Sequence, residues 1–218
     1  MPSTPAAVIF DNDGLTLNTE DHWTRAEVIL FERHGRTFTH DHKLQLVGTG
    51  GKAVEEALVR MLDAPEDAGG ALVAELRELV AEELARGCAP MPGAVELLQA
   101  MRSAEIPLAL CSNTPRRLVD GALRGAGLSQ AFDATVAGDE VAQPKPAPDP
   151  YLRAAAALGI EAAACIALED SATGAASARA AGMFVIGVPS VPGVTLDGVA
   201  DAVHRSLEDP ALWARLGL

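Results

Sequence analysis

Two acidic residues, Asp11 and Asp13, lie two positions apart at the end of the apolar run 8–10. Burying one carboxylate is costly, and burying two like charges is worse unless a cation or a reaction compensates. Loops after strands often carry Asp for turns and caps, so the pair alone is a modest signal. Its placement still makes both residues candidates for chemistry.

A second acidic pair, Glu169 and Asp170, ends the apolar run 165–168. Asp170 taken alone is explained equally well as the N-cap of the following helix. Two acidic pairs at one sheet edge, however, would repel each other strongly unless a cation lay between them. Carboxylate oxygens suit a hard divalent ion, so the two pairs together predict a Mg²⁺ site.

Polar residues also follow the apolar run 107–111. Ser112 and Asn113 stand before a helix that is predicted to begin at Pro115, with Thr114 as its N-cap. The free N–H groups at the start of a helix can cradle a phosphate group. Ordinary capping by Thr114 is the alternative explanation for this segment.

One lysine, Lys145, lies in the proline-rich stretch QPKPAPDP. Prolines restrict the backbone, so this side chain departs from a stiff frame, which favours a functional role over a solvated loop lysine. The four segments together supply a carboxylate nucleophile, a second carboxyl group, a hydroxyl and N–H cradle, a lysine and a metal site. That set is suited to phosphoryl transfer.

The elements that must position these residues alternate between strands and helices. Short apolar runs typical of parallel strands buried on both faces occur at residues 7–10, 107–111, 134–137, 165–168 and 183–188. Amphipathic helical stripes separate them. The pattern predicts a doubly wound α/β sheet, in which ligands bind at the carboxyl ends of the strands.

Residues 18–85 break this alternation, because they contain helical stripes and no convincing strand. We therefore expect an all-helical second domain at residues 18–85, inserted into a core domain made of residues 1–17 and 86–218. The hinges are expected near residues 15–18 and 86–92.

Composition narrows the function classes. The chain has 218 residues, 49% of them hydrophobic, and a formal net charge of −13, which argues against nucleic acid and anionic membranes as partners. The three cysteines, Cys88, Cys111 and Cys165, show no metal or redox spacing and suit buried positions in a reducing cytoplasm. We expect a cytoplasmic protein without a signal peptide or membrane span, acting as a monomer or weak dimer on a small phosphorylated molecule.

The chain resembles the haloacid dehalogenase superfamily, in the branch with a helical cap after the first strand. The segments that carry the resemblance are VIFDNDG, CSNTP, KPAPDPYLRAAAALG and LEDSATGAASARAAGM. The resemblance implies a Rossmann-like, three-layer α/β/α core with a mobile cap. It also implies that Asp11 attacks phosphorus to form an aspartyl-phosphate and that Asp13 is the general acid and base. Ser112 and Lys145 would hold the phosphoryl oxygens, assisted by Asn113.

The resemblance further implies a Mg²⁺ ion bound by Asp11, the backbone carbonyl of Asp13, and Asp170, with Glu169 either a ligand or beside one. The dehalogenases themselves lack an acid at the position of Asp13, which disfavours carbon–halogen cleavage. The expected activity is therefore hydrolysis of a phosphomonoester, with a sugar phosphate as the favoured substrate. A non-catalytic binder with a relic site is a more distant alternative.

The cap sequence NTEDHWTRAE is similar to sugar-phosphate phosphatases at Trp23, Ala26 and Glu27. The β-phosphoglucomutase-like isomerases, the main alternative, carry a histidine where Trp23 stands and an arginine in the loop that here reads VGTGGKAV. Both differences favour a hydrolase. Trp23 is a possible substrate contact or an aromatic residue of the cap core. Lys52 is a possible substrate contact, a solvated lysine or, as in a phosphonate-cleaving branch, an imine-forming nucleophile.

Overall fold

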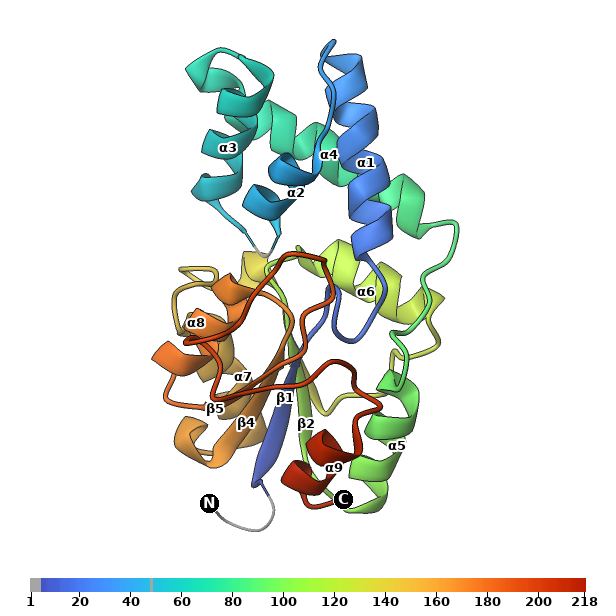
Figure 1. Cartoon of the computed structure of the whole chain (residues 1–218), viewed down its shortest axis with the longest axis vertical. Coiled ribbons are helices and arrows are strands. Elements are labelled where there is room, and N and C mark those ends of the chain that lie inside the picture. The colour runs from blue at the N-terminus through green and yellow to red at the C-terminus, as the bar shows by residue number, and fades with distance from the viewer. Residues whose placement is uncertain (1–4, 48) are drawn as a thin grey trace.

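A parallel sheet of six strands forms the centre of the computed structural model, which describes residues 5–47 and 49–218. The strand order is β3-β2-β1-β4-β5-β6, with β1 in the middle (Figure 1). The strands are β1 (Ala7–Asp11), β2 (Leu108–Cys111), β3 (Ala134–Val136), β4 (Cys165–Glu169), β5 (Phe184–Gly187) and β6 (Ala202–Val203). The predicted doubly wound α/β fold is confirmed, and only the two-residue edge strand β6 was not expected.

Side chains of β1 alternate between two hydrophobic clusters, as period-two geometry requires. Ala7 and Ile9 pack with α7 (Asp149–Leu158) and α8 (Ala172–Ala180) on one face of the sheet. Val8 and Phe10 pack with α5 (Ala94–Ser103) and α9 (Pro210–Leu216) on the other. Both faces of the strand are therefore covered, which explains its unbroken apolar sequence.

The strand register places the polar residues at one level. Asp11 is paired with Cys111 of β2, and Phe10 with Leu168 of β4. The residues that follow, Ser112 and Glu169, therefore emerge beside Asp11 at the carboxyl edge of the sheet. Helix α6 (Arg116–Gly125) begins after Pro115, one residue later than predicted, and Pro115 itself is extended, with ψ at 150°.

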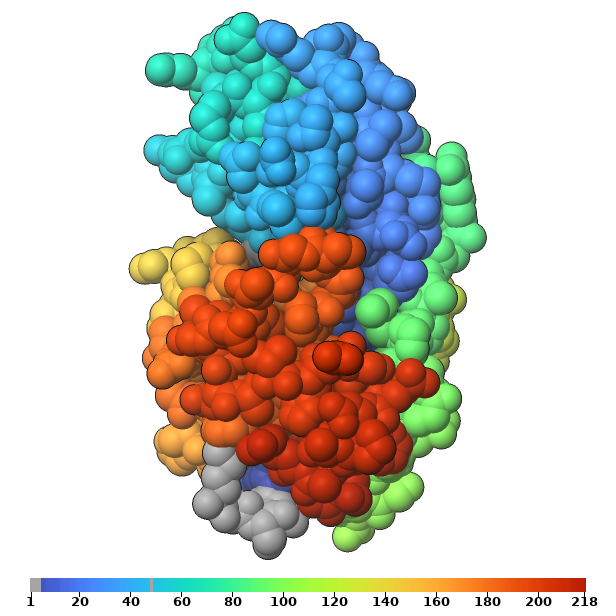
Figure 2. Space-filling model, viewed as in Figure 1, coloured from blue at the N-terminus to red at the C-terminus, as the bar shows by residue number. Residues whose placement is uncertain are grey.

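The inserted segment lies above this edge (Figure 1). Its four described α-helices are α1 (Glu20–Arg33), α2 (His40–Leu46), α3 (Lys52–Leu62) and α4 (Gly69–Leu84). Figure 2 shows the insert as a separate upper lobe over the larger core. The domain boundaries at 17/18 and 85/86 stay a prediction, since one hydrophobic cluster continues from α4 into α6.

The two segments that join the insert to the core run side by side. Leu17 forms an antiparallel bridge with Pro90. The Asn18 amide donates to Ala89 O at 2.9 Å, and the Met91 amide donates to Thr16 O at 3.0 Å. The chain therefore leaves the core and returns to it at one point. No α-helix in the described part of the chain has the length and apolarity needed to cross a membrane.

Candidate active site

Asp11, the last residue of β1, is buried and faces a lysine from a distant loop. Its Oδ1 lies 2.6 Å from Lys145 Nζ, and the same Nζ lies 2.6 Å from Glu169 Oε1. Lys145 is only 3% exposed and also donates to the carbonyl oxygen of Cys111 at 3.1 Å. The structure thus places the predicted lysine between two of the predicted carboxylates.

These charges influence one another because they share a buried site. Burial raises the pKa of Asp11 well above its ordinary value, against the opposing effect of Lys145. Burial alone would lower the pKa of Lys145, but its carboxylate neighbours reverse that shift and hold the pKa well above its usual range. These neighbours therefore favour the charged form of Lys145, and a further cation near Asp11 would favour the ionised form of that carboxyl group.

Tyr151, at the start of α7, supports this pair and was not predicted from the sequence. Its hydroxyl donates to Glu169 Oε1 at 2.7 Å, and its ring lies under Lys145 Nζ at 4.8 Å. The side chain is fully buried. Its position six residues after Lys145, on the first turn of a helix that packs against the sheet, is the signal that could have identified it.

Asp13 accepts hydrogen bonds from four side chains. Oδ2 accepts from the hydroxyls of Ser112 at 2.7 Å and Thr114 at 2.9 Å. Oδ1 accepts from Thr19 Oγ1 at 2.8 Å and from Trp23 Nε1 at 3.3 Å. Thr114 therefore contacts Asp13 and makes no capping bond to α6, contrary to the capping alternative, and α1 of the insert reaches the site directly.

Asn113 holds the loop that carries the lysine. Its Oδ1 accepts from the Lys145 amide at 2.8 Å, and its Nδ2 donates to the Lys145 carbonyl at 3.2 Å. Glycines keep room for the amide side chain, because a Cβ on Gly50 would lie 2.7 Å from Asn113 Nδ2. The predicted residues Ser112, Asn113 and Lys145 are thus gathered beside Asp11 and Asp13, and their binding of phosphate stays a prediction.

Three buried carboxylates have the chemistry of a Mg²⁺ site. Oxygens of Asp11, Glu169 and Asp170 lie within 4.8 Å of one another, the one such cluster found in the described residues. Burial, and then the other two carboxylates, raise the pKa of Asp170 well above its ordinary value. A Cβ on Gly14 would meet Asp170 Oδ2 at 2.3 Å, so a glycine is required there.

The three carboxylates fit a hard divalent cation, which would remove the repulsion between them. Asp11, Asp170 and Glu169 are three of the predicted ligands, and their binding of a metal together with the Asp13 carbonyl stays a prediction. Lys145 and Tyr151 already occupy Glu169 Oε1, so Asp11 and Asp170 have the more available oxygens.

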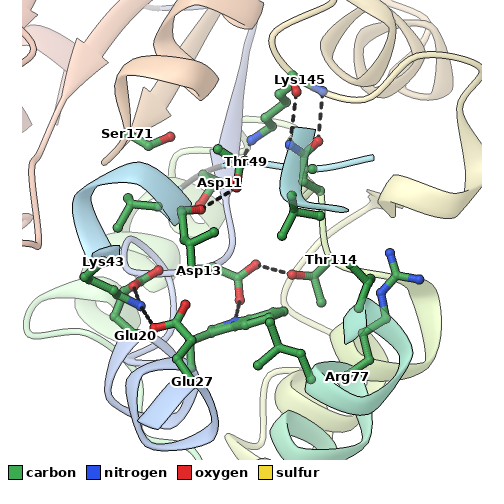
Figure 3. Close-up of a pocket in the computed structure, with 18 of the residues that line it drawn as sticks. Asp11, Asp13, Glu20, Glu27, Lys43, Thr49, Arg77, Thr114, Lys145 and Ser171 are labelled. Carbon is green, nitrogen blue, oxygen red and sulfur yellow. Dashed lines mark hydrogen bonds and ion pairs between the residues drawn. The ribbon is translucent and has the colours of Figure 1, made fainter. Parts of the chain in front are cut away.

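A cavity lies between the carboxyl edge of the sheet and the insert. Its volume, including the open mouth, is about 830 Å³. Asp11, Asp13 and Lys145 lie at its sheet side (Figure 3). From the insert, the cavity is lined by Glu20, Trp23, Glu27, Lys43, Leu46, Val47, Thr49, Gly50, Val54, Val73, Leu76 and Arg77. The predicted cap residue Trp23 therefore lies in the cavity.

The structure does not bring Lys52 to the cavity. Its side chain is 85% exposed, and its nearest charge is Glu56, 3.8 Å away. The cations that the insert does place there, Lys43 and Arg77, were not singled out from the sequence. No short motif marks them, since each lies on the inner face of an ordinary amphipathic helix.

Comparison with known proteins places the chain in a family. Residues 5–182 match the family described as haloacid dehalogenase-like hydrolase. The chain belongs to this family. The matched region contains the insert and all the carboxylates of the candidate site.

Two relatives of this haloacid dehalogenase-like hydrolase are more than 30% identical to it in sequence. Protein CbbY of Rhodobacter capsulatus is 37% identical, over 84% of this chain and 85% of that protein. The fructose-1-phosphate phosphatase YqaB of Escherichia coli is 31% identical, over 84% of this chain and 96% of its own length.

A solved structure of CbbY from Rhodobacter sphaeroides, in complex with phosphate, superimposes with a TM-score of 0.80 at 28% identity. It covers 94% of this chain and 95% of that one. The chain is therefore a hydrolase with phosphatases among its relatives.

Proposed function

We propose that this protein is a Mg²⁺-dependent phosphatase that hydrolyses the phosphomonoester of a small phosphorylated sugar. The observation that carries the proposal is the position of Lys145, buried between Asp11 and Glu169 with Asp13 and Asp170 beside it. A buried cation among carboxylates at the sheet side of a cavity is suited to an anionic substrate that carries a transferable phosphoryl group. Relatives named for sugar-phosphate substrates support the same substrate class.

In the first step, Asp11 attacks the phosphorus of the ester. Lys145 binds Oδ1 of Asp11, and no described residue donates to Oδ2, so that oxygen is available as the nucleophile. The new O–P bond forms as the bond from phosphorus to the sugar oxygen breaks. Asp13, in its protonated form, delivers a proton to the leaving oxygen, which takes the electron pair.

In the second step, the ionised Asp13 removes a proton from water, and the resulting hydroxide attacks the aspartyl-phosphate. Phosphate leaves, and the carboxylate of Asp11 is restored. Ser112 and Thr114, which donate to Asp13 in this structure, keep its carboxyl group oriented for both proton transfers. A Mg²⁺ ion held by Asp11 and Asp170 would offset charge on the phosphoryl oxygens, and Lys145 adds a second positive charge beside Asp11.

Two features of the insert support closure over the substrate. Thr19, the residue before α1, and Trp23 of α1 already bind Asp13, and apolar side chains such as Leu46 and Val54 line the cavity. An enclosed, partly apolar space excludes bulk water and strengthens the electrostatic interactions of the site. The insert would therefore select the leaving group, while the sheet edge performs the phosphoryl transfer.

A phosphate-release screen with Mg²⁺ over phosphorylated sugars, phosphoglycolate and nucleotides tests the proposal. We expect release from at least one sugar phosphate and loss of that release when a chelator removes the metal. Glucose 1-phosphate should be followed for conversion to the 6-phosphate as well. Conversion that depends on a bisphosphate, without steady release of phosphate, would instead identify an isomerase, and release that is indifferent to chelator would contradict the role of the metal.

A further inference from the structure

The insert contains a second buried lysine held by two carboxylates. Lys43 Nζ of α2 lies 2.7 Å from Glu20 Oε2 and 3.1 Å from Glu27 Oε2, both on α1. Lys43 and Glu27 are 6% and 3% exposed. Replacing such a buried ion cluster by apolar residues is often neutral or stabilising, so stability alone is a weak reason for it. All three residues line the same cavity as Asp11 (Figure 3).

The cluster has hydrogen-bonding capacity that the protein does not use. An ammonium group has three N–H donors, and Lys43 donates one of them to Glu27 Oε2 at 3.1 Å. Glu20 Oε2 is buried in ion-pair contact with Lys43 Nζ but accepts no hydrogen bond from the described residues. Within the described part of the chain, no group hydrogen-bonds Glu20 Oε1 or Glu27 Oε1 either. At least one donor and two acceptors are therefore available to a ligand in the cavity.

The charges of the cluster indicate which ligand suits it. Two carboxyl groups surround one ammonium, so no positive charge is left over to attract a second phosphate group. Hydroxyl groups, which are neutral and both donate and accept, match the available atoms. Arg77 lies on the opposite side of the cavity, away from this cluster (Figure 3).

We propose that Glu20, Lys43 and Glu27 form a subsite that recognises hydroxyl groups of a polyhydroxylated leaving group. The inference rests on the proposed phosphatase activity and identifies the side chains that distinguish a sugar from other alcohols. The carboxylate oxygens accept from hydroxyl groups of the leaving group, and the free N–H of Lys43 donates to a hydroxyl oxygen. The same contacts hold the sugar while its phosphoryl group lies at Asp11.

Two esters of equal chain length test the subsite. Xylitol 1-phosphate and pentyl phosphate differ only in their hydroxyl groups, and both are assayed with the full-length protein and Mg²⁺. We expect kcat/KM to favour the xylitol ester by at least about tenfold, the worth of one hydrogen bond to a charged group. Glu27→Gln should reduce this preference by a similar factor, about tenfold, and leave pentyl phosphate within about twofold of wild type.

Arg33→Met is the matched control. Arg33 also lies on α1 and forms an ion pair, 2.9 Å from Glu75, but its side chain is 54% exposed and does not line the cavity. This variant should leave the hydrolysis of both esters unchanged. If Glu27→Gln folds poorly, Glu20→Gln provides the same comparison from the other carboxylate.

Several outcomes would overturn the subsite. Equal losses on both esters would show a structural role only, and an unchanged preference would show that the hydroxyl groups are not recognised. Faster hydrolysis of 5-aminopentyl phosphate than of the xylitol ester would show that the cluster takes a cation. No release from any of these esters or from the sugar-phosphate screen would contradict the phosphatase itself, and the subsite with it.

Discussion

Each of the two buried lysines of this molecule forms ion pairs with two carboxyl groups, but the two clusters lie on different parts of the fold. Lys145 lies between Asp11 and Glu169, and Lys43 lies between Glu20 and Glu27. The first cluster is mounted on the ends of adjacent parallel strands, and a third carboxylate, Asp170, stands beside it. The second is mounted on two helices of the insert and has no further acidic group in its ion pairs.

The net charge of each cluster indicates which kind of ligand suits it. Three carboxylates and one lysine leave a deficit of positive charge that a divalent cation can fill. Two carboxylates and one lysine leave a deficit of at most one charge, and the pKa of Glu27, raised by burial to about 7, reduces it further, so neutral polar groups are the better ligands. The strand ends are also fixed by backbone hydrogen bonds of the sheet, which suits a site where reacting atoms must be held closely.

The largest effect should come from removing the nucleophile of the strand-end cluster. Asp11→Asn keeps the shape of the side chain but cannot attack phosphorus, so kcat should fall by roughly 10⁴-fold or more. Steady-state phosphate release measures the loss, and circular dichroism checks that the fold is retained. Activity near that of wild type would refute the role of Asp11.

Replacing each lysine separates the two clusters. Lys145→Met leaves the buried carboxylates of Asp11 and Glu169 without their cation, and Lys43→Met does the same to buried Glu27 and partly buried Glu20. Each change should lower the free energy of unfolding by about 3–5 kcal/mol. Only Lys145→Met should abolish hydrolysis of pentyl phosphate, since only Lys145 contacts Asp11. Urea unfolding and kinetics on pentyl phosphate measure both effects. Equal loss of activity in the two variants would remove the distinction between the clusters.

The insert cluster should also have its own pH dependence. Burial raises the pKa of Glu27 to about 7 from 4.5, against the opposing effect of Lys43. Between pH 4.5 and pH 7 the folded state therefore keeps a proton on Glu27 that the unfolded state has released. The free energy of unfolding of the wild type falls as pH rises through this range.

Glu27→Gln lacks this titrating group. Its free energy of unfolding minus that of wild type should therefore rise by about 3 kcal/mol between pH 4.5 and pH 7. Urea unfolding at pH 4.5 and pH 8 measures it. A constant difference would show that Glu27 is not titrating there.

The smallest effect is expected at Lys52. Its exposed side chain lies outside the cavity, so Lys52→Ala should change kcat/KM for any hydrolysed sugar phosphate by less than about twofold, as for most surface positions. Arg77→Ala is the useful comparison, because Arg77 is a cavity-lining cation of the insert. A large loss in Lys52→Ala would show that the insert rearranges on binding substrate.

The strand-end residues could be predicted because their sequence neighbours and the sheet geometry determine their place. Asp11 and Glu169 each end an unbroken apolar run, and parallel register brings such ends together. Lys145 was identified from its rigid proline frame. Together these features predict the fold and a cluster of carboxylates with a lysine from the sequence alone.

The remaining residues could not be found in the same way. Tyr151 and Thr114 act through single hydrogen bonds to Glu169 and Asp13, which depend on how a helix packs onto the sheet. The Lys43 cluster joins two helices whose relative rotation no local pattern encodes. Side-chain partners on helix faces are settled by tertiary packing, and a single sequence carries little information about them.

The paired connections between insert and core have a consequence for how such molecules diversify. Because Leu17 and Pro90 are paired, the two ends of the helical insert lie side by side, and the insert is joined to the core at a single point. Changes of length or sequence beyond that point do not interrupt the segments that form β1, β2 and β4. Evolution can therefore vary the side chains with which the insert lines the cavity while the residues at the sheet edge stay the same.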